Sequence, residues 1–70
     1  MHFAAQVQCH YCSHVFNVCL HTDQKPGLCQ RYVVRCPVNR SNCQIRGAEF
    51  SLVATCPENV VVLDDSAAVK

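Results

Sequence analysis

Two pairs of cysteines constrain this chain of 70 residues more than any other feature of its sequence. The first pair is Cys9 and Cys12, with two residues between them, and the second is Cys36 and Cys43, with six residues between them. A short strand-like run precedes each pair, and a tight turn after a strand can direct two sulfurs to one point. Two such turns facing each other supply four sulfurs, the ligand set of a tetrahedral structural Zn²⁺. The spacing therefore predicts a metal site made by Cys9, Cys12, Cys36 and Cys43.

The length of the chain predicts that something besides its core stabilises the fold. A chain of 70 residues forms one domain with a thin core, and such domains usually need a metal, disulfides or a partner. Trp is absent and only two Tyr and three Phe are available for packing, whereas seven residues are cysteines. We expect a single metal-stabilised domain over residues 1–63 and a flexible tail over residues 64–70.

Three features favour zinc over a disulfide framework. Residues 1–8 contain neither a basic region nor an apolar stretch of signal-peptide length. The cysteine count is odd, and Cys9 and Cys12 are too close to bridge each other outside redox proteins. No apolar run reaches the roughly 18 residues of a membrane helix. We expect a cytoplasmic protein, with a disulfide-held secreted module and a set of reduced structural cysteines as the alternatives.

Alternating apolar and polar residues predict an all-β fold. The alternation places Phe50, Leu52 and Ala54 on one face of a strand, while Pro26 with Gly27 marks a loop. No segment has a sustained period of 3.6 residues, so we expect little or no helix. The prediction is a small all-β domain of about four to five short strands, found in residues 3–8, 14–20, 28–35, 50–54 and 60–63, with the cysteine turns on β-hairpins.

These stretches resemble a zinc ribbon. Residues 7–18 resemble its first half, in which a two-cysteine knuckle is followed by a strand carrying an aromatic residue. Residues 32–37, continued by Cys43 and Phe50, resemble its second half, so that the likeness covers about residues 5–54. The chain is similar to the short zinc ribbons of bacteria and to the small zinc-finger transcription regulators of temperate phages. The resemblance implies a metal-held β module that often binds nucleic acid or protein, with these Zn²⁺ ligands: Cys9, Cys12, Cys36 and Cys43.

The sequence departs from the zinc-ribbon pattern in two places. The glycine that usually follows the second cysteine of each knuckle is replaced by Ser13 and by Gln44, which predicts strained turns. The second pair also has six intervening residues instead of two. The alternative to Cys43 as fourth ligand is therefore Cys56 or a histidine. Cys56, like Cys36, is followed by proline.

The remaining cysteines and histidines have simpler expected roles. Cys19, Cys29 and Cys56 could join His21 in a second site, but cysteine is among the most buried residue types, so we expect these three to fill the core. We expect the other histidines to be exposed or terminal: His2, His10 and His14.

No catalytic arrangement is expected. A chain this small has no room for a closed pocket, and its only glycines, Gly27 and Gly47, form no phosphate loop. A redox role for Cys9 and Cys12 would require a helix beginning at Cys9, but the following residues favour a strand. Four thiolates would also leave the metal no open position for catalysis. We therefore expect neither enzyme activity nor a small-molecule substrate.

The distribution of charge is the remaining clue to function. Residues 25–46 carry Lys25 and four arginines without any Asp or Glu, a charge of +5, whereas the rest of the chain sums to −4. Such a basic half, with Tyr32 for base stacking, is suited to phosphate contact. The candidate nucleic-acid contacts are Arg31, Arg35, Arg40 and Arg46. The same arginines could instead offset the charge of −2 that Zn²⁺ carries with four thiolates.

Two kinds of partner remain open at this point. The first hypothesis is a structural zinc ribbon that binds nucleic acid, as a small regulator. The second is a zinc-ribbon adaptor that docks on a protein through an exposed edge formed by residues 60–63. Neither hypothesis includes a membrane partner.

Overall fold

Seven β-strands and two single-turn 3₁₀-helices form residues 1–69, the part of the chain that the computed structural model describes. The predicted small all-β class is confirmed, and no α-helix occurs among these residues. Nor is any helix among them long and apolar enough to cross a membrane. The elements are β1 (His2–Gln8), β2 (Val15–His21), β3 (Arg31–Arg35), β4 (Asn42–Arg46), η1 (Gly47–Glu49), β5 (Ser51–Val53), β6 (Val61–Leu63), η2 (Asp65–Ala67) and β7 (Ala68–Val69).

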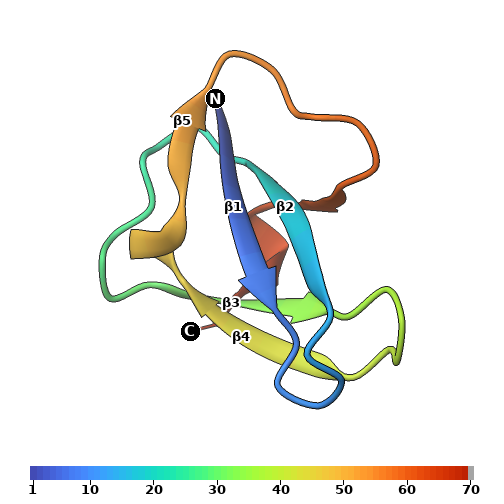
Figure 1. The fold of residues 1–70 in the computed structure, drawn as a ribbon. Helices are drawn as coiled ribbons and strands as arrows, with labels where there is room; N and C mark the ends of the chain where they lie inside the picture. Colours follow the sequence, from blue (N-terminus) through green and yellow to red (C-terminus); the bar gives the residue numbers. More distant parts are fainter. Residues whose placement is uncertain (70) are drawn as a thin grey trace.

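The strands form two sheets, each built on a hairpin (Figure 1). The first has the order β5-β1-β2-β6, with β1 and β2 antiparallel along their whole length and β6 parallel to β2. The second has the order β4-β3-β7, with all neighbours antiparallel. Each hairpin carries one of the two cysteine turns, so each turn is supported by a different sheet.

Period-two alternation fixes which faces are buried. Phe3, Ala5 and Val7 of β1 pair with the inward-facing Leu20, Val18 and Phe16 of β2. From the second sheet, Tyr32 and Val34 of β3 pair with Ile45 and Cys43 of β4 on the buried face. Because successive side chains of a strand point to opposite faces, this pattern leaves the polar residues of both hairpins in solvent. The core that results is thin, and three of the four cysteines predicted as ligands are part of it: Cys9, Cys36 and Cys43.

Two strands are shorter than the alternation predicted. The strand expected over residues 28–35 begins only at Arg31, because the N–H of Gln30 donates to the carbonyl of Gly27 in a turn (3.1 Å). Leu28 and Cys29 lie in that turn and are exposed, so the expectation of a core role for Cys29 is wrong.

The strand expected over residues 50–54 is also interrupted. Phe50 is buried, but it ends η1 and packs edge-on against Tyr32, with 5.5 Å between the ring centroids. Leu52 is 64% exposed and Ala54 is exposed, so the predicted common face of these three residues is wrong. The reason is that β5 is an edge strand of three residues that pairs only with β1.

The segment expected as a tail contains secondary structure. Asp64 caps η2 through its side chain, which accepts a hydrogen bond from the N–H of Ser66. The following β7 pairs with the start of β3, and the Gln30 side-chain amide donates to the carbonyl of Val69 (3.0 Å). Lys70 lies outside the described residues.

Gly47 begins η1, and the turn there depends on close backbone approach. The N–H of Gly47 donates to the carbonyl of Gln30 (2.7 Å), and a Cβ at Gly47 would collide with the carbonyl oxygen of Gly27. Gly47 therefore holds the loop before β3 against the end of β4.

Substituting Gly47→Ala should lower the free energy of unfolding by about 1–3 kcal/mol, because the added methyl group has to displace backbone atoms. Gly27→Ala is the matched control, since a Cβ there meets nothing within 4 Å. Chemical denaturation of both variants measures the difference, and equal stabilities would contradict this role of Gly47.

Candidate metal centre

The first cysteine turn is a six-residue loop closed by backbone hydrogen bonds. The N–H of Cys9 donates to the carbonyl of His14 (2.9 Å), and the N–H of Ser13 donates to the carbonyl of Cys9 (3.0 Å). Ser13 has φ 59°, the left-handed conformation that glycine adopts most easily. The strain predicted where serine replaces the usual glycine is thus present.

The second cysteine turn has the same backbone pattern. The N–H of Cys36 donates to the carbonyl of Ser41 (3.0 Å), and the N–H of Arg40 donates to the carbonyl of Cys36 (2.9 Å). Arg40 has φ 61° and is thus the counterpart of Ser13. The predicted strain at Gln44 is wrong, because Gln44 already belongs to strand β4.

Asn39 occupies the place of the second cysteine in this turn. It follows Cys36 by three residues, as Cys12 follows Cys9. Its side-chain oxygen accepts hydrogen bonds from the N–H and the hydroxyl of Ser41 (2.9 and 2.6 Å), while its amide donates to Cys9 Sγ (3.3 Å). Asn39 therefore closes the turn and contacts the sulfur cluster without supplying a sulfur.

Cys43 lies outside the turn but brings a further sulfur next to Cys9. It is the second residue of β4, where it faces inward and pairs with Val34 of β3. Its Sγ lies 3.8 Å from Cys9 Sγ. The wide loop of residues 37–42 thus brings Cys43 back beside the first turn, which explains the spacing of six residues.

The sulfur positions fit a metal ion. The Sγ atoms of Cys9, Cys12 and Cys36 lie within 4.8 Å of one another, with 3.7 Å between Cys12 and Cys36. A tetrahedral ion with metal–sulfur bonds of about 2.3 Å places its sulfurs about 3.8 Å apart, close to the distances of the pairs Cys12–Cys36 and Cys9–Cys43. Cys12 is exposed, whereas the other three are buried. This cluster could hold a metal ion, and an ion there would join the two hairpins.

The local hydrogen bonds favour one thiolate in this cluster. Burial opposes ionisation of Cys9, but hydrogen bonds from the N–H groups of Cys12 and Tyr11 and from the side chains of Ser41 and Asn39 outweigh it and lower the pKa of Cys9 to about 5.

The neighbouring sulfurs behave in the opposite way. A backbone hydrogen bond favours ionisation at both Cys12 and Cys43, but burial and the adjacent sulfurs outweigh it and raise the pKa of each thiol. At neutral pH the cluster therefore holds protons that an incoming cation must displace, so its metal affinity should rise with pH.

The remaining cysteines and histidines lie apart from this cluster or at its rim. Cys56 forms a disulfide with Cys19, so the structure places Cys43, and not Cys56, beside Cys9. The disulfide was missed, although Cys19 is buried as expected.

His2 was expected to be terminal and disordered but is part of β1. The expected exposure of the two histidines near the first turn is confirmed: His10 and His14.

The predicted basic residues gather on the second hairpin. Arg31 and Arg35 are exposed on the same face of β3, with Val33 between them, and Arg31 lies directly opposite Arg46 of β4. Arg40 is exposed in the turn, where its carbonyl accepts a hydrogen bond from Arg35 Nε (3.3 Å).

One aromatic expectation is wrong. Tyr32 was expected to stack on a base, but it is only 4% exposed and packs against Phe50. Its place on β3 explains this, because alternation turns it to the face opposite the arginines. A shallow cleft of about 410 Å³ lies beside the arginine face, lined by His10, Arg31, Gln44, Ile45, Arg46 and Glu49.

Comparison with known proteins finds no matching family model, no matching curated protein and no matching solved structure. The function proposed for this chain therefore depends on the chemistry of its own residues.

The equivalence of Asn39 and Cys12 predicts that a sulfur can be moved within the second turn. Cys43→Ser should lower metal affinity at least tenfold, because one of the four thiolates is lost. Adding Asn39→Cys to that variant should restore much of the affinity, since it recreates a turn with cysteines three residues apart. Competition titration with a chromogenic chelator measures both constants.

The control for this pair is Asn42→Cys in the Cys43→Ser background. Residue 42 is exposed on β4, so a cysteine there faces away from the cluster and should not rescue binding. Equal rescue by both cysteines, or none by Asn39→Cys, would contradict the equivalence of the two turns.

Proposed function

We propose that this protein is a zinc-ribbon module in which one structural Zn²⁺, bound by Cys9, Cys12, Cys36 and Cys43, presents a nucleic-acid-binding hairpin. The metal assignment is supported by the all-sulfur donor set and by sulfur separations of 3.7 and 3.8 Å. Four thiolates leave no open coordination position, so the ion stabilises the fold and performs no catalysis.

The arginine pair Arg31 and Arg46 carries the proposal for nucleic acid. Like charges directly opposite each other on antiparallel strands destabilise a sheet. An anion bound between the two exposed guanidinium groups would offset their repulsion. A phosphate can accept hydrogen bonds from both arginines with suitable geometry. The paired positions on this face of the hairpin contain no carboxylate: Arg31, Val33 and Arg35 on β3, and Asn42, Gln44 and Arg46 on β4.

The surroundings of this pair favour a polyanion over a single phosphate. Arg35 and Arg40 extend the positive charge along β3 into the second cysteine turn. The hairpin therefore offers a row of guanidinium groups that can follow successive phosphates. His10 lines the adjacent cleft, and Tyr11 is exposed in the first turn, so a ring is available near the row for contact with a base.

A protein adaptor is the second candidate, and the edge of the first sheet favours it. Strand β6 is the outer strand of that sheet, so one of its edges has no strand partner among the described residues. Val62 at its centre is 61% exposed. An extended peptide could add to this edge by backbone hydrogen bonds, with Val62 as an apolar contact.

Salt dependence tests the nucleic-acid proposal. Binding through about four phosphate contacts should give a slope of log K against log salt of roughly −3 to −4. Arg31→Ala or Arg46→Ala should each reduce that slope by about one, with similar losses for different base sequences. Lys25→Ala, which removes the same charge outside the hairpin, should leave the slope nearly unchanged. Fluorescence anisotropy with single- and double-stranded oligonucleotides measures each slope.

Metal affinity must be measured on the same variants. If the arginines only offset the charge of the metal–thiolate cluster, the Arg→Ala variants will lose metal affinity. The wild type will then show no salt-dependent binding to the oligonucleotides at about 50 mM salt. That result would refute the nucleic-acid proposal. Capture of one protein partner that is lost on Val62→Lys would then favour the adaptor.

A further inference from the structure

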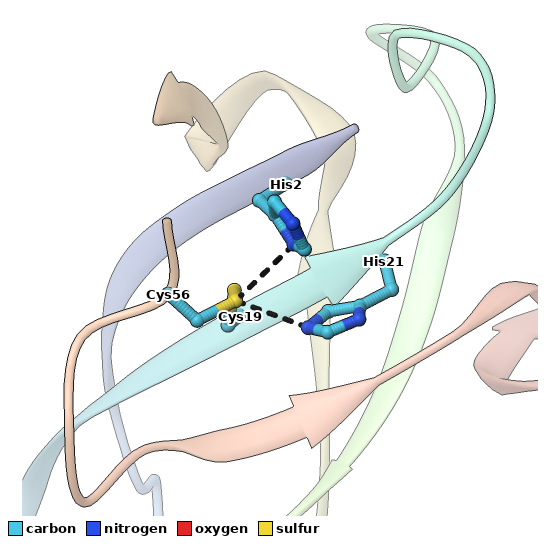
Figure 2. Close-up of a disulfide and its surroundings, with 4 residues drawn as sticks. All are labelled: His2, Cys19, His21 and Cys56. Carbon is cyan, nitrogen blue, oxygen red and sulfur yellow. Dashed lines mark hydrogen bonds between the residues drawn. A yellow bond between two sulfur atoms is a disulfide. The ribbon is translucent and has the colours of Figure 1, made fainter. Parts of the chain in front are cut away.

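Four metal-ligating side chains converge at the end of the β1–β2 hairpin that is far from the cysteine turns. His2 of β1 lies directly opposite His21 of β2, and Cys19 precedes His21 by two residues and so shares its face. The loop between β5 and β6 carries Cys56 over this face (Figure 2). This is the outer face of the sheet, because the core residues of β1 and β2 point the other way.

The distances within this group are those of a ligand set. Cys56 Sγ lies 3.0 Å from His21 Nε2 and 3.6 Å from His2 Nδ1, and Figure 2 shows both rings directed at the sulfur. One donor atom from each of the four residues lies within 4.8 Å of all the others. A tetrahedral Zn²⁺ with bonds of about 2.3 Å to sulfur and 2.0–2.1 Å to nitrogen separates a sulfur from a nitrogen by about 3.6 Å. The four side chains therefore need only small movements to surround one ion.

We propose that His2, Cys19, His21 and Cys56 form a second Zn²⁺ site, which is filled when the two cysteines are thiols and emptied when they form the disulfide. Two sulfurs and two imidazole nitrogens are a common closed ligand set for structural zinc. A disulfide alone gives no reason for two imidazoles from different strands to point at one of its sulfurs, whereas a metal site requires both.

The conversion between the two states balances as a thiol–disulfide exchange. A dithiol reductant transfers two electrons and two protons to the Cys19–Cys56 bond, which gives two thiols and leaves the reductant as a disulfide. Zn²⁺ then displaces the two thiol protons and binds both thiolates together with the neutral imidazoles. Oxidation reverses the sequence and releases the ion.

The surroundings favour a cation. A shallow cleft of about 300 Å³ beside the two imidazoles is also lined by Asp23 and Asp65. Carboxylates beside a metal site can accept the second N–H of a ligating imidazole and attract a positive ion. Cys19 is fully buried, so an ion bound there would be partly shielded from competing ligands in solution.

Metal counting on the full chain tests the second site. Protein kept in a phosphine reductant, which breaks disulfides, should show seven free thiols and bind about two Zn²⁺ per chain by mass spectrometry under native conditions. After mild oxidation, five thiols should remain and about one Zn²⁺ should be lost. His21→Ala and His2→Ala should each lower the reduced protein to about one Zn²⁺, whereas His10→Ala, which removes an exposed histidine outside this group, should keep about two.

Cobalt(II) identifies which site is filled, so this test does not depend on the zinc ribbon or on nucleic-acid binding. Four sulfurs and a set of two sulfurs with two nitrogens give different d–d spectra, and only the second spectrum should disappear in His21→Ala or on oxidation. A metal count of the reduced chain that is unaffected by His21→Ala, or a cobalt spectrum without the mixed-ligand component, would overturn the proposal and leave a structural disulfide.

Discussion

The convergence of four sulfurs from two hairpins is the contact on which the rest of the structure depends. Cys9 and Cys12 belong to the four-stranded sheet, whereas Cys36 and Cys43 belong to the three-stranded sheet. Without a cation, neighbouring sulfurs oppose one another's ionisation, as the raised pKa of Cys43 beside Cys9 and Cys36 indicates. A divalent ion bound there would turn that repulsion into attraction and would close one end of a thin core.

The two ends of the β1–β2 hairpin have different chemistry. The turn end carries an all-sulfur cluster, next to the arginine face of the second hairpin. The far end carries two sulfurs and two imidazoles under the loop between β5 and β6. If both ends bind zinc, the ion at the turn orients the binding hairpin, and the ion at the far end fixes the covering loop according to the redox state of Cys19 and Cys56.

The alternation of apolar and polar residues and the cysteine spacing predicted much of this structure. The features that these local patterns did not predict depend on contacts between segments far apart in the sequence. Alternation was sufficient to locate β1 and β2, because a strand half-buried on one face imposes a period of two on its residues. It failed at Leu52, whose exposure depends on β5 being an edge strand. For the second cluster, a site of Cys19, Cys29 and Cys56 with His21 was an alternative, but the three cysteines were expected to fill the core and His2 was not included. The sequence Cys19-Leu20-His21 puts two ligands on one face, but strand register brings in His2 and a loop supplies Cys56, and neither follows from spacing.

The measurement that tests the central claim most directly is an amide NMR spectrum of the reduced protein before and after complete metal removal by a strong chelator. The account predicts that signal dispersion collapses on chelation and returns when Zn²⁺ is added, and that Cys9→Ser never acquires a dispersed spectrum. His21→Ala should remain dispersed until its single ion is removed, because this substitution leaves the sulfur cluster between the hairpins intact. Native dispersion that survives the loss of all metal would contradict the account.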